Sequence, residues 1–99
     1  MIDLNQISGF DWDEGNARKN EKHGVSMAQA EQVFFNSPLL VLEDAIHSED
    51  EMRLHALGIT DEKRALHVTL TLRQSGKLIR VISARDMSRK ERVIYDQAR

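Results

Sequence analysis

Apolar and polar positions along the chain follow two different periods, which predict helices first and strands afterwards. The segment 27–35 places its apolar residues at the three- and four-residue spacing of a helix that buries one face. From 66 to 72, leucine and valine alternate with histidine and threonine, which predicts a strand with one buried side. Leu39–Leu42 is a short apolar run typical of a strand inside a sheet.

Helix-capping residues divide the chain further. Asp13 is suited to cap a helix that runs to Lys22 or His23, and Gly24 is suited to end it. Ser26 and Ser88 each stand three residues before a Gln or Glu, the pattern of a capping box. They predict helices over 27–35 and 89–98.

The remaining segments predict strands joined by tight turns. The expected strands are 10–12 at a sheet edge, 39–42, 53–60, 66–72 and 78–84. Gln74–Lys77 is expected to form a hairpin turn, with Gly76 at positive φ. Apolar residues at both odd and even positions of 78–84 predict a strand that is covered on both faces.

This order of elements predicts an α+β fold. We expect two N-terminal helices, an antiparallel sheet of about four strands and a C-terminal helix, in one domain over residues 1–99. Residues 1–9 show no period, so we expect them to be loosely ordered.

Composition excludes several classes of protein. The 99 residues include no cysteine, which excludes disulfides, thiolate metal sites and thiol nucleophiles. The chain has no apolar run long enough to span a membrane and no signal-peptide pattern, so we expect a cytoplasmic protein. Residues 1–72 hold 6 Lys and Arg against 13 Asp and Glu, whereas residues 73–99 hold 8 against 3. The basic end is either an anion-binding face or a solvated surface.

Motifs for nucleotides and metals are missing or incomplete. The chain has neither a phosphate-binding glycine loop nor histidines at zinc-ligand spacing. Asp11–Gly15 begins like a calcium loop, but its glycine comes one residue early and the later ligands are missing. The acidic run Glu49–Glu51 suits either a divalent ion or a solvated loop. We therefore expect no metal and no cofactor.

Three arginines are the first candidates for contact with phosphate, because guanidinium groups bind phosphate bidentately and stay charged at every working pH. Arg80 lies inside an apolar strand segment, where it either faces a cleft or pairs with an acidic residue such as Glu43 or Glu91. Arg85 ends the same strand. Arg53 follows an acidic loop, so it either neutralises that loop or contacts the substrate.

Other side chains suit both a structural and a functional interpretation. His23 is suited to proton transfer near neutral pH, but it also stands at a helix end that favours a cation. Lys22 shares that position. Tyr95 suits a phosphate contact or packing against the sheet, and Trp12 suits base stacking or the core. Arg89 and Lys90 suit an RNA backbone or an acidic partner.

The chain resembles the BrnT toxin family, whose members are similar in fold to RelE-type ribonucleases. The resemblance covers about residues 10–96 and rests on Phe10–Asp13, Lys22–Ser26, Arg53 with Gly58, Arg80–Arg85, Glu91–Arg92 and Tyr95. It implies an endoribonuclease toxin that cleaves RNA without a metal ion or cofactor and so inhibits translation. It also implies neutralisation by a BrnA-like ribbon-helix-helix antitoxin, whose complex with the toxin represses its own promoter.

The resemblance and the chemistry of the side chains together give the candidate site residues. We expect catalytic roles for His23, Arg53, Arg80 and Arg85, and substrate binding by Lys22, Arg89, Lys90 and Tyr95. Metal-free cleavage uses the ribose 2′-hydroxyl as nucleophile, so the protein has to orient the phosphate, neutralise its charge and move protons. Asn16 stands near a position where many members carry lysine. An alternative is therefore a non-catalytic module that binds an antitoxin and contributes to promoter repression, and a third is plain RNA binding.

Overall fold

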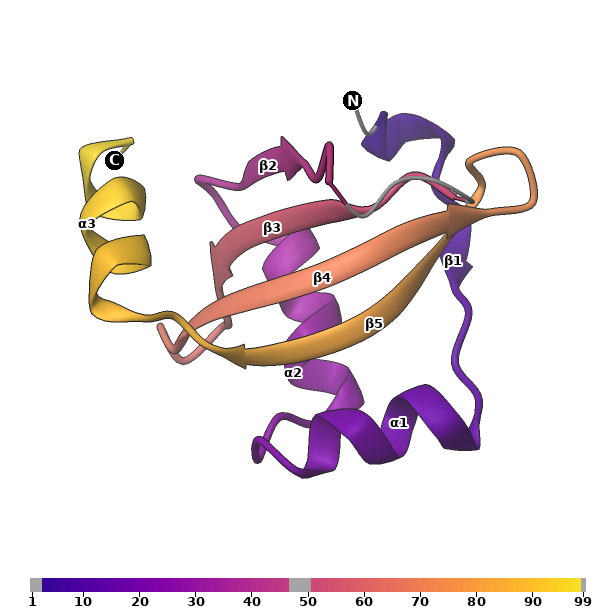
Figure 1. The fold of residues 1–99 in the computed structure, drawn as a ribbon, viewed down its shortest axis with the longest axis horizontal. Helices are drawn as coiled ribbons and strands as arrows, with labels where there is room; N and C mark the ends of the chain where they lie inside the picture. Colours follow the sequence, from indigo (N-terminus) through magenta and orange to yellow (C-terminus); the bar gives the residue numbers. More distant parts are fainter. Residues whose placement is uncertain (1–2, 47–50, 99) are drawn as a thin grey trace.

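The computed structural model describes residues 3–46 and 51–98 and shows a twisted sheet with helices packed on both of its faces (Figure 1). In chain order its elements are the 3-10 helix η1 (Leu4–Gln6), strand β1 (Gly9–Phe10), helices α1 (Glu14–Glu21) and α2 (Met27–Gln32), the 3-10 helix η2 (Val33–Phe35), strands β2 (Leu40–Glu43), β3 (Leu54–Ile59), β4 (Ala65–Arg73) and β5 (Leu78–Asp86), and helix α3 (Arg89–Gln97). The α+β class is therefore confirmed. None of the helices in the described ranges has the length and apolar run that crossing a lipid bilayer requires.

The three α-helices begin at the positions that the capping residues in the sequence predicted. Asp13, Ser26 and Ser88 each accept the backbone N–H three residues on, and the side chain at that third position bonds back to the N-cap N–H. Such a cap contributes about 1 kcal/mol. The predicted helix 27–35 is α-helical only to Gln32 and continues as the 3-10 turn η2. Gly24 adopts a φ of 68°, which suits its place after α1.

The sheet contains five strands in the order β1-β5-β4-β3-β2. Strands β2 to β5 pair antiparallel as hairpin neighbours, as predicted. The expectation of an antiparallel sheet of about four strands is therefore confirmed for β2 to β5, but the sheet is mixed, because β1 pairs parallel with β5 at its edge. The segment before β1, which we expected to be loosely ordered, contains η1, and the Ser8 N–H donates to the Lys77 carbonyl at 2.8 Å.

A β-bulge interrupts the pairing of β4 with β5. Thr69 pairs with Ser83, but the next residue, Leu70, pairs with Val81, so Ile82 is the extra residue. The bulge explains why β5 has apolar residues at both odd and even positions. Only one face of β5 is fully buried, the face that carries Ile79, Val81 and Ala84. The prediction that both faces of this strand are covered was therefore wrong.

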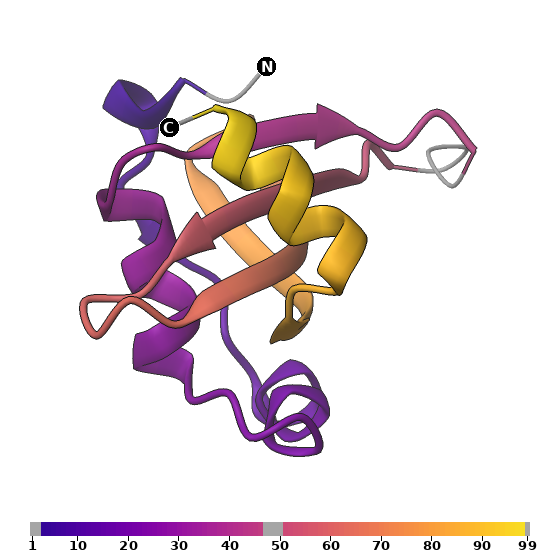
Figure 2. The same ribbon diagram turned by 90° about the vertical axis from the view of Figure 1, so that its left-hand side faces the viewer.

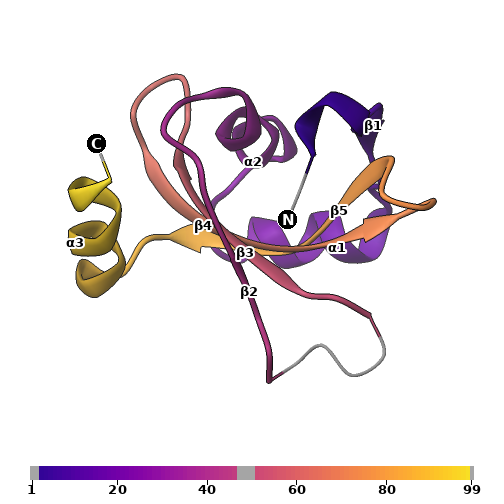
Figure 3. The same ribbon diagram turned by 90° about the horizontal axis from the view of Figure 1, so that it is seen from above.

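The main core lies between the sheet and α2, and Figure 3 shows α2 on one side of the strands. It consists of Val25, Ala30, Val33, Phe34, Leu54, Ala56, Leu66, Val68, Leu70, Ile79, Val81 and Ala84. Each large aliphatic side chain in such a core contributes about 1.5–3 kcal/mol. A smaller cluster on the opposite face consists of Leu57, Ile59, Ala65, Met87 and Tyr95. There α3 crosses one end of the strands (Figure 2), and the rest of that face carries the groove described next.

Candidate active site

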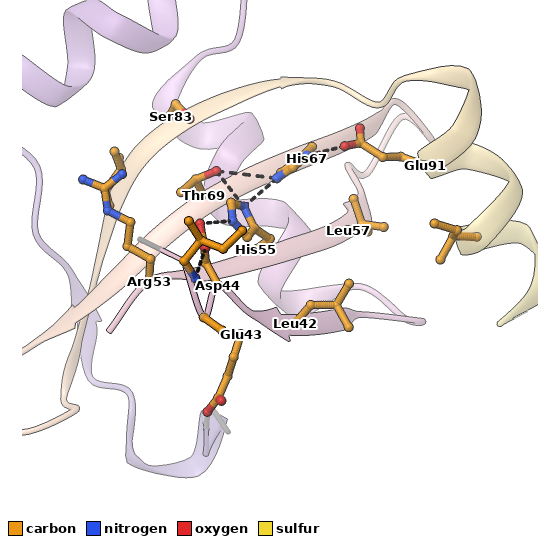
Figure 4. A pocket seen from close by; sticks show the side chains of 14 residues that line it. Leu42, Glu43, Asp44, Arg53, His55, Leu57, His67, Thr69, Ser83 and Glu91 are labelled. Atoms are coloured by element: carbon orange, nitrogen blue, oxygen red, sulfur yellow. Dashed lines mark hydrogen bonds and ion pairs between the residues drawn. The ribbon is translucent and has the colours of Figure 1, made fainter. Parts of the chain in front are cut away.

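A groove with a cavity volume of about 760 Å³ lies on the sheet face opposite α2 (Figure 4). Its lining residues come from β2 and the turn after it, from β3 to β5 and from α3: Leu42, Glu43, Asp44, Ala45, Ile46, Arg53, His55, Leu57, His67, Thr69, Ile82, Ser83, Glu91 and Ile94. The bulge turns both Ile82 and Ser83 towards this face. Aliphatic side chains form much of the wall, and the polar groups gather at its centre.

Two histidines from adjacent strands meet at the centre of the groove. The Nδ1 atom of His55 on β3 lies 2.9 Å from Nε2 of His67 on β4, and the ring planes are inclined at 85°. The Thr69 hydroxyl lies 3.0 Å from His55 Nδ1. The outer nitrogens face carboxylates, because His55 Nε2 is 2.9 Å from Asp44 Oδ2 and His67 Nδ1 is 2.7 Å from Glu91 Oε2. The two rings therefore lie in a continuous hydrogen-bonded row that ends in an acid on each side.

Glu91 joins this row to α3 and β5. Its Oε1 accepts from the Ser88 N–H at 2.9 Å, which completes the α3 capping box. Arg85 donates to both carboxylate oxygens, at 2.8 and 3.0 Å. The Arg85 hydrogen bonds are the main reason why the pKa of Glu91 falls to about 2, so Glu91 is an anion at every physiological pH. The same contact raises the pKa of Arg85 above its ordinary value.

Burial has the larger effect on His67. Its side chain is 13% exposed, against 28% for His55. Loss of water around the ring lowers the pKa of His67, and the hydrogen bond to Glu91 opposes this shift without cancelling it. His55 is therefore the ring that a molecule entering the groove can reach more easily.

The structure separates the four residues that we expected to be catalytic. Arg53 lines the groove beside His55, and Arg85 contacts two lining residues, His67 and Glu91. Arg80 is not among the described lining residues. Its guanidinium binds Asp13 at 2.8 Å and Asp11 at 3.5 Å beside α1, so its expected partners Glu43 and Glu91 were wrong.

His23 also lies outside the described lining of the groove, exposed in the turn between α1 and α2. Lys22, in the same turn, is exposed too. Arg80 also accounts for the acidic pair that began like a calcium loop, since both carboxylates face its guanidinium.

The other predicted substrate-binding residues lie on α3. Arg89 and Lys90 are exposed in its first turn, next to Glu91. Tyr95 is 2% exposed, and its hydroxyl donates to the Pro38 carbonyl at 2.6 Å, so it packs α3 onto the sheet and leaves no surface for RNA. We therefore withdraw Tyr95 as a substrate contact.

The indole of Trp12 is half-buried against the main core and donates to Glu31 at 2.8 Å. Of the acidic run in the β2–β3 connection, Glu49 and Asp50 lie outside the described residues, and Glu51 pairs with Arg73 at 3.3 Å. Within residues 3–46 and 51–98, no three His, Asp or Glu side chains are arranged to hold a metal ion.

Sequence analysis missed the histidine pair and Asp44, although the signal was present. A hairpin that turns at Asp61–Lys63 pairs His55 with Thr69. His67 then lies two residues along the same face of β4, within reach across the strands. We compared the histidines only with zinc-ligand spacings within one segment, and that test cannot detect a pair formed across a sheet.

Comparison with known proteins agrees with this architecture. The family model described as "Ribonuclease toxin, BrnT, of type II toxin-antitoxin system" matches residues 12–91. This range includes every strand of the sheet except β1, and every described lining residue of the groove except Ile94. No curated protein matched the chain at the similarity that we required. A match over this share of the sequence identifies the chain as a member of the BrnT family of ribonuclease toxins of type II toxin–antitoxin systems.

Proposed function

We propose that this chain is an endoribonuclease whose active site is the groove around His55 and His67. The observation that supports this most directly is the pairing of two imidazoles in a groove that Arg53 also lines, with Arg85 in contact with His67 behind its wall. Imidazoles transfer protons near neutral pH, and guanidinium groups stabilise phosphate charge. These are the two requirements of phosphodiester cleavage by a neighbouring hydroxyl.

The proposed reaction uses the RNA's own nucleophile. The ribose 2′-oxygen forms a bond to the adjacent phosphorus while the bond from phosphorus to the 5′-oxygen breaks. His55, the more exposed ring, takes the 2′-hydroxyl proton, and the leaving 5′-oxygen receives a proton from the same site. The products are a 2′,3′-cyclic phosphate and a 5′-hydroxyl, and the reaction needs neither a metal ion nor a covalent intermediate.

Arg53 and Arg85 are placed to neutralise charge on the phosphate oxygens. Removing one preorganised donor to a transition-state oxyanion costs about 10²–10³ in rate. Arg53 lines the groove on the side away from α3, whereas Arg85 lies outside the described lining and donates to both oxygens of Glu91. We therefore propose that Arg53 contacts the scissile phosphate and that Arg85 acts mainly by holding the row of hydrogen bonds in place.

The groove is larger than a single phosphate requires, and its aliphatic wall offers a seat for a base. Leu42 and Leu57 form the wall near α3 (Figure 4), and Ile94 of α3 completes it. Leu42 is 53% exposed and Ile94 42%, so a base that stacks there would remove apolar surface from water. Arg89 and Lys90 extend the site along α3 as contacts for neighbouring phosphates.

Family membership supports further proposals about partners. We propose that a BrnA-like ribbon-helix-helix antitoxin neutralises the chain, that their complex represses its promoter, and that the free toxin inhibits translation in the cytoplasm. These proposals rest on the family description and not on the geometry of the groove.

The decisive experiment incubates purified protein with RNA in the presence of a chelator and analyses the product ends. His55→Ala should lower the cleavage rate about 10²–10⁴-fold, since it removes a proton-transfer group. His23→Ala is the matched control, because it removes an exposed histidine outside the groove and should leave the rate unchanged. Arg53→Ala and Arg73→Ala form a second matched pair, with Arg73 bound to Glu51 away from the cavity.

Two outcomes would contradict the proposal in different ways. Full activity of His55→Ala together with an inactive His23→Ala would move the catalytic centre to the turn between α1 and α2. Undegraded RNA with the unmodified protein, combined with tight binding of the antitoxin, would support the non-catalytic module instead.

A further inference from the structure

The row Asp44–His55–His67–Glu91 has a property that neither histidine has alone, namely a proton count that depends on the whole row (Figure 4). A carboxylate only accepts hydrogen bonds, so the ring nitrogen that faces each end of the row has to carry a proton. His55 Nε2 faces Asp44 at 2.9 Å and His67 Nδ1 faces Glu91 at 2.7 Å. Both outer nitrogens are therefore N–H donors.

The two inner nitrogens then require one proton between them. His55 Nδ1 and His67 Nε2 lie 2.9 Å apart, a hydrogen-bond distance that two lone pairs would not keep. Arg85 Nη2 also lies 2.9 Å from His67 Nδ1, but a lone pair there would face the Glu91 oxygen at an even shorter distance. The pair is satisfied by three N–H protons, one more than two neutral imidazoles carry.

The charges around the pair act in both directions, so the hydrogen-bond geometry carries the count. The Asp44 and Glu91 carboxylates face the outer ring nitrogens and favour an extra proton on the rings. The Arg85 guanidinium opposes it, as does the burial that lowers the pKa of His67. Among the other charged groups at the groove, Arg53 lies on the wall beside His55 and the Glu43 carboxylate points away from the pair. Thr69 adds an uncharged hydroxyl at 3.0 Å from His55 Nδ1.

We infer that His55 and His67 form a single acid–base unit that shares one extra proton, and that Asp44 and Glu91 are the positioning residues that hold it there. The use of this unit in catalysis rests on the proposed function, but its existence does not. In its two-proton form the unit accepts the 2′-hydroxyl proton and becomes the three-proton form. It then returns one proton to the 5′-oxygen, so no net proton is gained or lost.

Shared protonation predicts that a change at one end of the row is felt at the other. Glu91→Gln removes the charge that favours the third proton, while a Gln at this position can still complete the α3 capping box. Loss of an opposite charge at this distance moves a titration by about 1–3 pH units. The third proton should therefore leave at a pH that is lower by about that amount, and the titration of both rings should shift.

The experiment is an NMR titration of the ¹⁵N-labelled full chain without RNA, in which both rings are followed. In Glu91→Gln the resonances of His55 should shift with those of His67, although His67 is the one ring of the pair that Glu91 contacts. Asp44→Asn tests the row from the other end and should move His67 in the same direction. Glu31→Gln is the control, since Glu31 binds Trp12 away from the groove and its loss should move neither ring.

A His55 titration in Glu91→Gln that matches the unmodified protein would overturn the inference, because the rings would then be independent. Cleavage measured against pH gives the second readout. The rising limb of kcat/KM should move to lower pH in Glu91→Gln by the same amount as the NMR midpoint. Coupled titration in a protein that never cuts RNA would refute the proposed function alone, whereas cutting with independent rings would refute the shared proton alone.

Discussion

Gly58 offers the sharpest test of how the sheet packs on its helices. It lies in β3, against η2, and a Cβ atom added there would stand 2.6 Å from Val33 Cγ1 and 3.3 Å from the Val33 carbonyl oxygen. Carbon atoms in contact are about 3.5–4.0 Å apart, so about 1 Å of separation is missing. Val33 is 0% exposed, and a β-branched side chain in a helical backbone has little freedom to rotate.

We therefore expect Gly58→Ala to destabilise the protein by about 1–3 kcal/mol, the usual cost of overpacking a core. For a domain of this size about 2 kcal/mol lowers Tm by roughly 8–16 °C. Urea unfolding followed by circular dichroism measures the free energy directly.

Val33→Ala in the same background is the matched test of the cause. It removes the clashing methyl group, so the double variant should be more stable than the sum of the single changes by about 1 kcal/mol or more. Gly58→Ala with the stability of the unmodified protein, or strictly additive effects, would refute the close approach of β3 and η2.

Three further predictions test other parts of the molecule. Asn20→Leu should raise the free energy of unfolding by about 1–2 kcal/mol. The reason is that, within residues 3–46 and 51–98, no protein group forms a hydrogen bond with either polar atom of this fully buried side chain. A lower free energy of unfolding in the variant would contradict this prediction. Because the fold lowers the pKa of Glu91 from 4.5 to about 2, ionised Glu91 stabilises the folded state at pH values above 4.5, and this contribution is lost as the pH falls through about 2. In urea unfolding, Glu91→Gln should therefore cost about 1–2 kcal/mol near neutral pH, after allowance for solvent screening, and almost nothing at pH of about 2; a cost independent of pH would refute the assignment. Arg80→Ala should lower the RNA cleavage rate far less than Arg53→Ala, since Asp13 holds Arg80 outside the groove, and equal losses would place Arg80 in the site.

The parts of the fold that follow from local chemistry could be predicted from the sequence. Asp13, Ser26 and Ser88 cap the helices that they were expected to cap, because a capping box involves only residues three positions apart. The alternation in 66–72 identified β4 for a similar reason, since each side chain reports its own face of the strand.

Features that depend on distant segments were not predictable in the same way. The parallel pairing of β1 with β5 joins residues about 70 positions apart, and no local pattern records it. The histidine pair lies between these extremes. Its strands are hairpin neighbours, so the register was within reach once the turn was placed, whereas the approach of Asp44 and Glu91 depends on how a loop and α3 fold over the sheet.

The extra residue in β5 decides which chemical groups the sheet presents to solvent at its far end. Without the bulge, the same residues would alternate strictly between the two faces from Ile79 onward, and Ala84 and Arg85 would exchange sides. A guanidinium would then replace a methyl group in the interior, with no carboxylate from α3 to meet it. The bulge thus keeps the Arg85 guanidinium on the groove face, where Glu91 meets it, and the Ala84 methyl group in the interior.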